Sequence, residues 1–175
     1  MPETRTDKER VELALTTERD GNGFYEQASK RMKHKLARAA FEMLAKEELR
    51  HVALIEGLGQ RLDGEGGPLD PDSPTLKDLQ ANVQTIYGAA TEEGGGEGDL
   101  DPAEAYRKAI ELEEKISSLY YGYIEECDSD EAKRLFDVLY REERDHLTLL
   151  EDMLGYLTKP DQWFIDRDMV MLDGG

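Results

Sequence analysis

Two copies of the pattern Glu-x-x-His bring together residue types that bind transition metals in proteins. The copies are Glu48-Leu-Arg-His51 and Glu143-Arg-Asp-His146. Residues three apart lie on the same face of a helix, so each copy would present a carboxylate beside an imidazole. This mixed ligation suits iron or manganese, and zinc can occupy such a site as well. Because the chain has 40 acidic residues, the pattern alone is weak and its meaning depends on the helices that position it.

Four long stretches repeat apolar residues at helical spacing, and strand patterns are scarce, which predicts an all-α chain. The expected helices cover residues 7–31, 35–62, 102–127 and 130–157. Asp101 followed by Pro102 is typical of a helix start, with an acidic N-cap and a proline at the first helical position. Ser129 or Asp130 can cap the last helix. We expect one domain over residues 1–175, built as a four-helix bundle.

Each predicted helix has one apolar stripe, and one glutamate interrupts it. The stripes include Val11 in the first helix, Ile55 and Leu62 in the second, Tyr106 in the third, and Met153 and Leu157 in the fourth. These glutamates are Glu18, Glu48, Glu113 and Glu143. Carboxylates that face one another inside a bundle cost several kcal/mol per uncompensated ion. No Lys or Arg lies on the same stripes near them, so we expect two divalent cations, with His51 and His146 completing the coordination. One Glu from each of two helices plus Glu-x-x-His from each of the other two is the ligand set of di-iron and di-manganese bundles.

An internal repeat appears when residue n is set beside residue n + 95 without a gap. The candidate ligands fall into the matched pairs Glu18/Glu113, Glu48/Glu143 and His51/His146. Further identical pairs are Ala14/Ala109, Tyr25/Tyr120, Phe41/Phe136, Leu44/Leu139, Leu54/Leu149 and Leu62/Leu157. Two similar helical hairpins would pack around a pseudo-two-fold axis, and a two-metal site suits such an axis.

A long crossover, residues 64–101, joins the hairpins and is rich in glycine at both ends. Apolar residues from Leu76 to Tyr87 at helical spacing predict one short extra helix within this spacer. A crossover of this length permits two chains to exchange hairpins, so a domain-swapped homodimer stays open. The C-terminal tail, residues 158–175, is apolar enough to dock on the bundle or on another subunit.

The formal net charge of -18 argues against binding to nucleic acid or to anionic lipid. Cys127 is the only cysteine, which excludes an intrachain disulfide and a cysteine-based zinc or iron–sulfur site within the chain. The N-terminus is polar, and no apolar run approaches the roughly 20 residues of a bilayer span. We therefore expect a soluble protein of the reducing cytoplasm.

The ligand pattern resembles the rubrerythrin branch of the ferritin-like superfamily. The likeness covers roughly residues 7–62 and 102–157, and it includes Tyr25 and Tyr120, two turns after the first glutamate of each hairpin. The resemblance implies a ferritin-like fold that holds two iron ions, with manganese or a mixed iron and manganese pair as the alternative.

The resemblance also implies a role for each site residue. All four glutamates would be ligands, with Glu48 and Glu143 bridging the ions. His51 and His146 would bind one ion each. Tyr25 and Tyr120 would hydrogen-bond the carboxylates behind the ligands, whereas in an ordinary bundle they would be plain core aromatics.

Two departures from the rubrerythrins bear on the chemistry. Rubrerythrins carry a further glutamate three residues after the third-helix ligand, which exchanges with a histidine as the iron changes oxidation state. Ile116 occupies that position and Gly21 its repeat partner, and neither can ligate. The four cysteines of a rubredoxin domain are also missing, so electrons would come from a separate protein or a small reductant. Gly21 either leaves room for O₂ or peroxide or marks a local kink.

The leading hypothesis is a non-haem di-iron oxidoreductase that reduces hydrogen peroxide or O₂. An iron-binding or ferroxidase protein, which oxidises Fe(II) and passes it on or stores it, fits the same residues. A third hypothesis is a helical interaction module with a structural metal. If the glutamates are instead exposed and the histidines incidental, the pattern arises in an acidic helical protein without any metal site.

Overall fold

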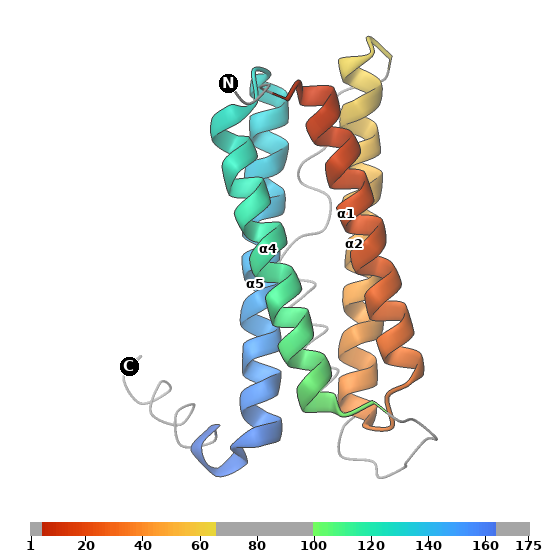
Figure 1. Cartoon of the computed structure of the whole chain (residues 1–175), viewed down its shortest axis with the longest axis vertical. Helices are drawn as coiled ribbons and strands as arrows, with labels where there is room; N and C mark the ends of the chain where they lie inside the picture. Colours follow the sequence, from red (N-terminus) through yellow and green to blue (C-terminus); the bar gives the residue numbers. More distant parts are fainter. Residues whose placement is uncertain (1–4, 66–99, 164–175) are drawn as a thin grey trace, which may run out of the picture.

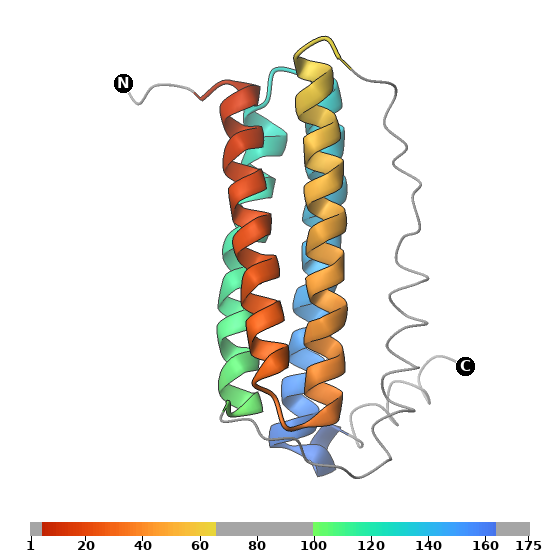
Figure 2. The ribbon, with the colours of Figure 1, turned by 90° about the vertical axis from the view of Figure 1, so that its right-hand side faces the viewer.

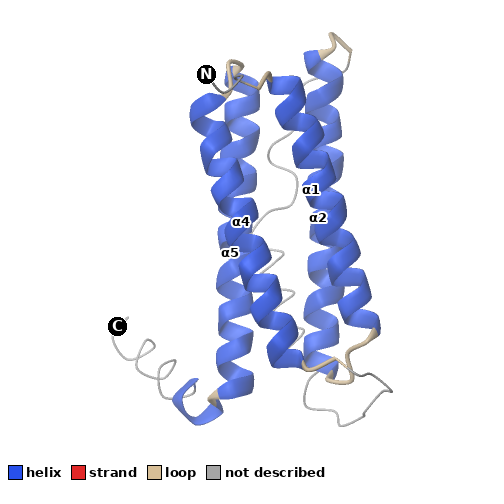
Figure 3. Cartoon of the chain, viewed as in Figure 1, coloured by secondary structure: helices blue, strands red, loops and turns tan. Residues whose placement is uncertain are grey.

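The computed structural model describes residues 5–65 and 100–163, which form a bundle of long helices (Figures 1 and 3). The helices are α1 (Asp7–Lys30), α2 (Lys35–Leu62), α4 (Pro102–Glu126) and α5 (Asp130–Thr158). Each begins and ends within one residue of the expected position, and the described residues contain no strand, which confirms the all-α prediction. The short helix expected in the crossover lies outside the described residues, as does the tail beyond Trp163.

Side chains at the helix starts accept hydrogen bonds from backbone N–H groups that would otherwise lack partners. Thr6 does so for α1, and Asp101 and Ser129 do so for α4 and α5, as expected. His34 caps α2 through its Nδ1, which lies 3.3 Å from the backbone nitrogen of Ala37. These caps fix where each helix begins, and therefore which side chains face the core.

The chain folds into two antiparallel hairpins, α1–α2 and α4–α5, which lie side by side (Figures 1 and 2). α1 lies beside α4, and α2 lies beside α5. The end of α2 and the start of α4 are at opposite ends of the bundle (Figure 1), so these two helices run in the same direction. Every neighbouring pair is then antiparallel, which is the arrangement expected of a two-fold axis perpendicular to the helices.

The apolar core consists of two clusters, one toward each end of the bundle. Phe41 anchors one cluster, with ring centroids 5.6 Å from Tyr25 and 4.9 Å from Tyr106. Its repeat partner Phe136 anchors the other cluster, 5.4 Å from the ring of Tyr120. Between the clusters lies a layer of buried polar side chains, so the core is apolar at both ends and ionisable in the middle.

Polar contacts fix the chain at both ends of the bundle. Asp7 accepts hydrogen bonds from the backbone nitrogens of Asp128 and Ser129, at 3.1 and 2.8 Å, which ties the start of α1 to the turn before α5. At the other end Trp163 donates from Nε1 to Asp152, at 2.8 Å. The tail therefore folds back onto α5 as far as it is described. Among the described helices, none is both long enough and apolar enough for a bilayer span.

Candidate metal centre

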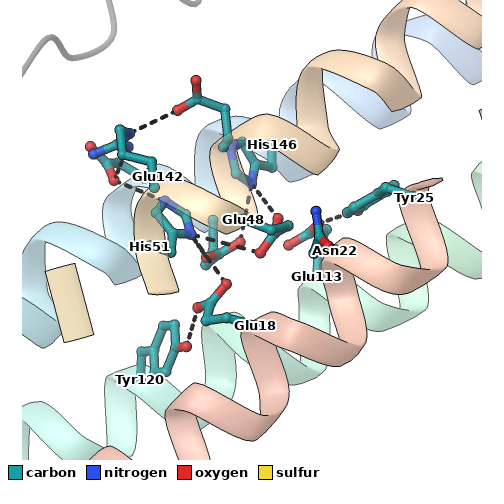
Figure 4. Close-up of polar contacts among 12 residues, drawn as sticks. Glu18, Asn22, Tyr25, Glu48, His51, Glu113, Tyr120, Glu142 and His146 are labelled. Atoms are coloured by element: carbon teal, nitrogen blue, oxygen red, sulfur yellow. Dashed lines mark hydrogen bonds and ion pairs between the residues drawn. The ribbon is translucent and has the colours of Figure 1, made fainter. Parts of the chain in front are cut away.

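The buried polar layer contains all of the predicted ligands, and at most 1% of each side chain is exposed. α1 and α4 each contribute one glutamate, and α2 and α5 each contribute a glutamate and a histidine (Figure 4). The residues are Glu18, Glu48, His51, Glu113, Glu143 and His146. The structure therefore brings together side chains that lie as far as 128 positions apart, from Glu18 to His146.

The ligand atoms form two overlapping groups of four, and within each group they lie within 4.8 Å of one another. One group contains Glu18 and His51 of the first hairpin, and the other contains Glu113 and His146 of the second. Glu48 and Glu143 belong to both groups. Two metal positions that share a pair of carboxylates would need this arrangement.

Both imidazoles point their Nδ1 atoms into the carboxylate cluster. His51 Nδ1 lies 2.9 Å from Glu143 Oε1 and 3.3 Å from Glu18 Oε2. His146 Nδ1 lies 3.2 Å from Glu143 Oε2 and 3.5 Å from Glu48 Oε1. The two rings are stacked, with centroids 5.4 Å apart. Nδ1 is therefore the nitrogen that each histidine could offer to a metal.

Each tyrosine of the site crosses from its own hairpin to a glutamate of the other. The Tyr25 hydroxyl donates to Glu113 Oε1, and the Tyr120 hydroxyl donates to Glu18 Oε1 (Figure 4). Burial and the nearby carboxylate charges raise the pKa of both hydroxyls well above the ordinary value. Both tyrosines therefore stay protonated at neutral pH and remain hydrogen-bond donors.

The glutamates of the cluster differ in the direction of their pKa shifts. Burial, followed by the charges of Glu143 and Glu18, raises the pKa of Glu48 well above its ordinary value. Burial and the charge of Glu143 also raise the pKa of Glu113. Burial acts the same way on Glu18, but the charge of His51 and hydrogen bonds outweigh it and lower its pKa to about 2. Without a metal, Glu48 and Glu113 therefore hold their protons to higher pH than an ordinary glutamate, which favours a lower charge on the cluster.

The pKa values of the two histidines also shift in opposite directions. Burial acts to lower the pKa of His51, but the charges of Glu143 and Glu18 raise it well above the ordinary value. For His146 burial prevails and lowers the pKa. A protonated His51 thus supplies positive charge inside the metal-free cluster.

Unpaired carboxylate oxygens show that these residues fit a metal centre. Among the described residues, none donates a hydrogen bond to either oxygen of Glu48 or to Oε2 of Glu113. Such oxygens are rarely left without partners in a protein interior, because the lost hydration is costly. Carboxylate oxygens and neutral imidazole nitrogens are ligands for iron and manganese, so a pair of divalent ions would compensate both the charge and the missing partners.

Glu142 and Arg50 are part of the site, although the helical stripes did not indicate them. Glu142 Oε2 lies 3.0 Å from His51 Nε2, on the side of the ring that faces away from the cluster. Arg50 donates to the same carboxylate oxygen at 2.6 Å. The Glu-Glu pairs at 47–48 and 142–143 were the available signal, since a residue next to a ligand lies at the edge of the core stripe.

Gly21 lies directly beside the cluster in an unbroken α1. A Cβ atom at this position would be 3.5 Å from Glu48 Oε2. The neighbouring Asn22 donates from its side chain to the backbone oxygen of Ala45 in α2, at 2.7 Å. The repeat partner Ile116 is an apolar core residue that is 1% exposed. The position that could hold a further ligand therefore has no side chain in the first hairpin and an apolar side chain in the second.

A helical bundle that gathers a glutamate from each of its long helices and a histidine from two of them at its centre has the architecture of the ferritin-like di-metal carboxylate proteins. Comparison with known protein families identifies the family within this class. The family model described as Rubrerythrin matches residues 9–154, and the chain belongs to the rubrerythrin family.

A solved structure, "Hypothetical Protein Pfu-1136390-001" from Pyrococcus furiosus, has a similar fold, with a TM-score of 0.61. The match covers 87% of this chain and 90% of that one at 22% sequence identity, so the likeness concerns the fold alone. A search of curated proteins finds no match.

Proposed function

We propose that this protein is a non-haem di-iron oxidoreductase that reduces hydrogen peroxide or O₂. The observation that carries the proposal is the pair of overlapping ligand groups that share Glu48 and Glu143 in a fully buried layer. Membership of the rubrerythrin family supports the same class of reaction. Two bound metal ions would supply electrons for the oxidant and neutralise negative charge as it develops.

The protein would contribute position, proton control and exclusion of water. The glutamates and the Nδ1 atoms of the histidines would hold the ions. Tyr25 and Tyr120 keep their protons and orient Glu113 and Glu18 through hydrogen bonds. The aromatic clusters on either side of the site, built around Phe41 and Phe136, keep bulk water from the carboxylates.

We further propose that electrons come from a separate donor protein, because the chain has a single cysteine and so cannot form the four-cysteine site of a rubredoxin. Gly21 and Ile116 provide no carboxylate that could exchange with a histidine during turnover. The proposed reaction therefore uses a fixed set of ligands. The cytoplasmic location and the domain-swapped homodimer remain predictions from the sequence.

Metal analysis followed by anaerobic Fe(II) loading and stopped-flow absorption tests the proposal. We expect about two irons per chain and a rapid rise of ferric absorption on mixing with hydrogen peroxide or, separately, with O₂. Repeated turnover with a reductant supports the oxidoreductase. Net accumulation of Fe(III) per chain would support an iron-handling ferroxidase instead, and stable metal without any reaction would leave a structural role.

A further inference from the structure

The imidazole of His51 is held on both of its nitrogen atoms. Nδ1 faces the carboxylate cluster, and Nε2 lies 3.0 Å from Glu142 Oε2. Arg50 bonds the same oxygen of Glu142 at 2.6 Å, so the carboxylate is itself fixed. At 10% side-chain exposure Glu142 is nearly buried, and Arg50 at 21% is partly shielded from water.

The corresponding contact is missing around His146. The internal repeat pairs Glu142 with Glu47 and Arg50 with Asp145. Glu47 Oε2 accepts from Arg50 Nε at 3.1 Å. Within the described ranges, no residue forms a hydrogen bond with His146 Nε2. The two histidines thus offer equivalent nitrogens to the cluster but have different support behind the ring.

The cause of this asymmetry is one pair of residues. Arg50 carries a guanidinium that bonds both Glu47 and Glu142, whereas Asp145 is a carboxylate and attracts neither. In the first hairpin the arginine holds Glu142 of the other hairpin against the imidazole. In the second hairpin no arginine holds Glu47 against His146.

We propose that Arg50 and Glu142 are positioning residues that fix the His51 imidazole with Nδ1 toward the carboxylates, so that the two metal positions differ in affinity. A carboxylate that accepts the outer N–H of a metal-binding histidine fixes the tautomer and the ring orientation and strengthens the ligand. This inference rests on the proposed two-metal centre and adds a difference between its two positions.

Titration of the metal-free protein with Co(II), followed by visible absorption, tests the inference. We expect two separable binding steps in the wild-type protein. Glu142→Ala should weaken one of the two steps by about 10–100-fold, the usual cost of losing such a partner, and leave the other step unchanged. Glu142→Gln should lose less, because its amide oxygen can still accept from Nε2. Glu47→Gln is the matched control, since Glu47 also bonds Arg50 but not an imidazole, and it should leave both steps unchanged.

Proton NMR of the Co(II)-loaded protein gives a second measurement that a general loss of packing would not reproduce. The outer N–H proton of His51 should exchange slowly with solvent in the wild type, quickly in Glu142→Ala, and should be absent from His51→Gln. Two identical binding steps in the wild type, or equal weakening of both steps in Glu142→Ala, would overturn the inference while leaving the two-metal centre intact. A wild-type protein that binds no Co(II) would overturn both.

Exchanging the two divergent residues offers the sharpest version of this test. The double variant Arg50→Asp with Asp145→Arg places the guanidinium in the second hairpin, where it should hold Glu47 against His146. We expect the slowly exchanging N–H to move from His51 to His146. An N–H that stays with His51 would contradict the role of Arg50.

Discussion

The two hairpins of this bundle carry the same candidate ligands in different surroundings. The repeat preserves a glutamate on the first helix and Glu-x-x-His on the second, and the structure places both sets in one buried layer. Around them the hairpins diverge, with Gly21 opposite Ile116 and Arg50 opposite Asp145. The comparison teaches that the residues facing the buried cluster are the same in both halves, while the residues behind them make the two halves unequal.

Removing a shared glutamate should have the largest effect, and the same effect in both hairpins. Glu48→Ala and Glu143→Ala each take a ligand from both groups, so we expect loss of two-metal binding, measured by metal analysis after equilibration with Fe(II) under anaerobic conditions. The exposed Glu42→Ala and the helix-capping His34→Ala serve as controls and should retain both ions. Equal losses in the site variants and the controls would contradict the assignment.

Truncating the aromatic anchors should cost stability in both hairpins alike. Phe41→Ala and Phe136→Ala each remove a fully buried ring, and we expect a loss of about 3–5 kcal/mol in the free energy of unfolding. Urea denaturation of the metal-free protein measures it. Leu49→Ala, at a position 51% exposed, should change stability by less than about 0.5 kcal/mol. Markedly different losses in the two phenylalanine variants would show that the hairpins do not contribute equally to the core.

The two crossed tyrosine hydrogen bonds should contribute unequally to stability, and this difference distinguishes the hairpins. Tyr120 donates to Glu18, which is ionised because its pKa lies at about 2. Tyr25 donates to Glu113, whose raised pKa favours the protonated, uncharged carboxyl. We therefore expect Tyr120→Phe to destabilise the metal-free protein by about 1.5–3 kcal/mol and Tyr25→Phe by about 0.5–1.5 kcal/mol. Thermal unfolding at neutral pH provides the measurement, and the reverse ranking would be inconsistent with these protonation states.

Metal affinity should rise with pH. The raised pKa values of Glu48, Glu113 and His51 mean that these groups hold their protons to higher pH in the metal-free protein than ordinary side chains of their kind. Metal binding needs them deprotonated, so it releases protons and is favoured as the pH rises toward those pKa values. We expect about a tenfold gain in affinity per pH unit for each proton released. Calorimetry in buffers of different ionisation enthalpy counts the protons, and a pH-independent affinity would refute the prediction.

The smallest predicted effect concerns Gly21. Gly21→Ala replaces the poorest non-proline helix former and adds a Cβ at an ordinary contact distance of 3.5 Å from Glu48, so stability should rise by about 0.5–1 kcal/mol. Gly122→Ala, whose added Cβ would meet nothing within 4 Å, should give a similar gain. If the space beside Glu48 admits the oxidant, only Gly21→Ala should slow the reaction of the Fe(II)-loaded protein with peroxide. Equal rates in the two variants would leave Gly21 without a role in access.

The sequence predicted the helices and their buried faces because both depend on local spacing. Val11, Ile55 and Met153, for example, lie in the core as their stripes indicated, and the cap at Asp101 begins α4. Leu62 and Leu157 were placed on the same stripes but are only partly buried, since they lie at the helix ends where the neighbouring helices no longer cover them. Periodicity along one helix therefore predicts burial well in its middle and poorly at its ends.

Contacts between helices were harder to predict because they depend on how far side chains extend across the bundle. The sequence indicated that Tyr25 and Tyr120 bond carboxylates, but not that each bonds a carboxylate of the opposite hairpin. Glu142 lies at the margin of its stripe, and its contact with His51 depends on the distance between α2 and α5 and on the length of Arg50. The sequence gives the length of the Arg50 side chain but not the distance between the helices, so it does not predict this contact.

Because each hairpin orients a ligand of the other, one hairpin alone holds only half of a centre. Two identical hairpins could associate as a symmetric pair and build the same ligand set, but every substitution would then appear twice. An arginine in one hairpin would then have an arginine at the equivalent position of the other. Joining the hairpins in one chain removes that restriction and lets a single substitution change one half. The fused chain can therefore evolve unequal halves, which a dimer of identical hairpins cannot.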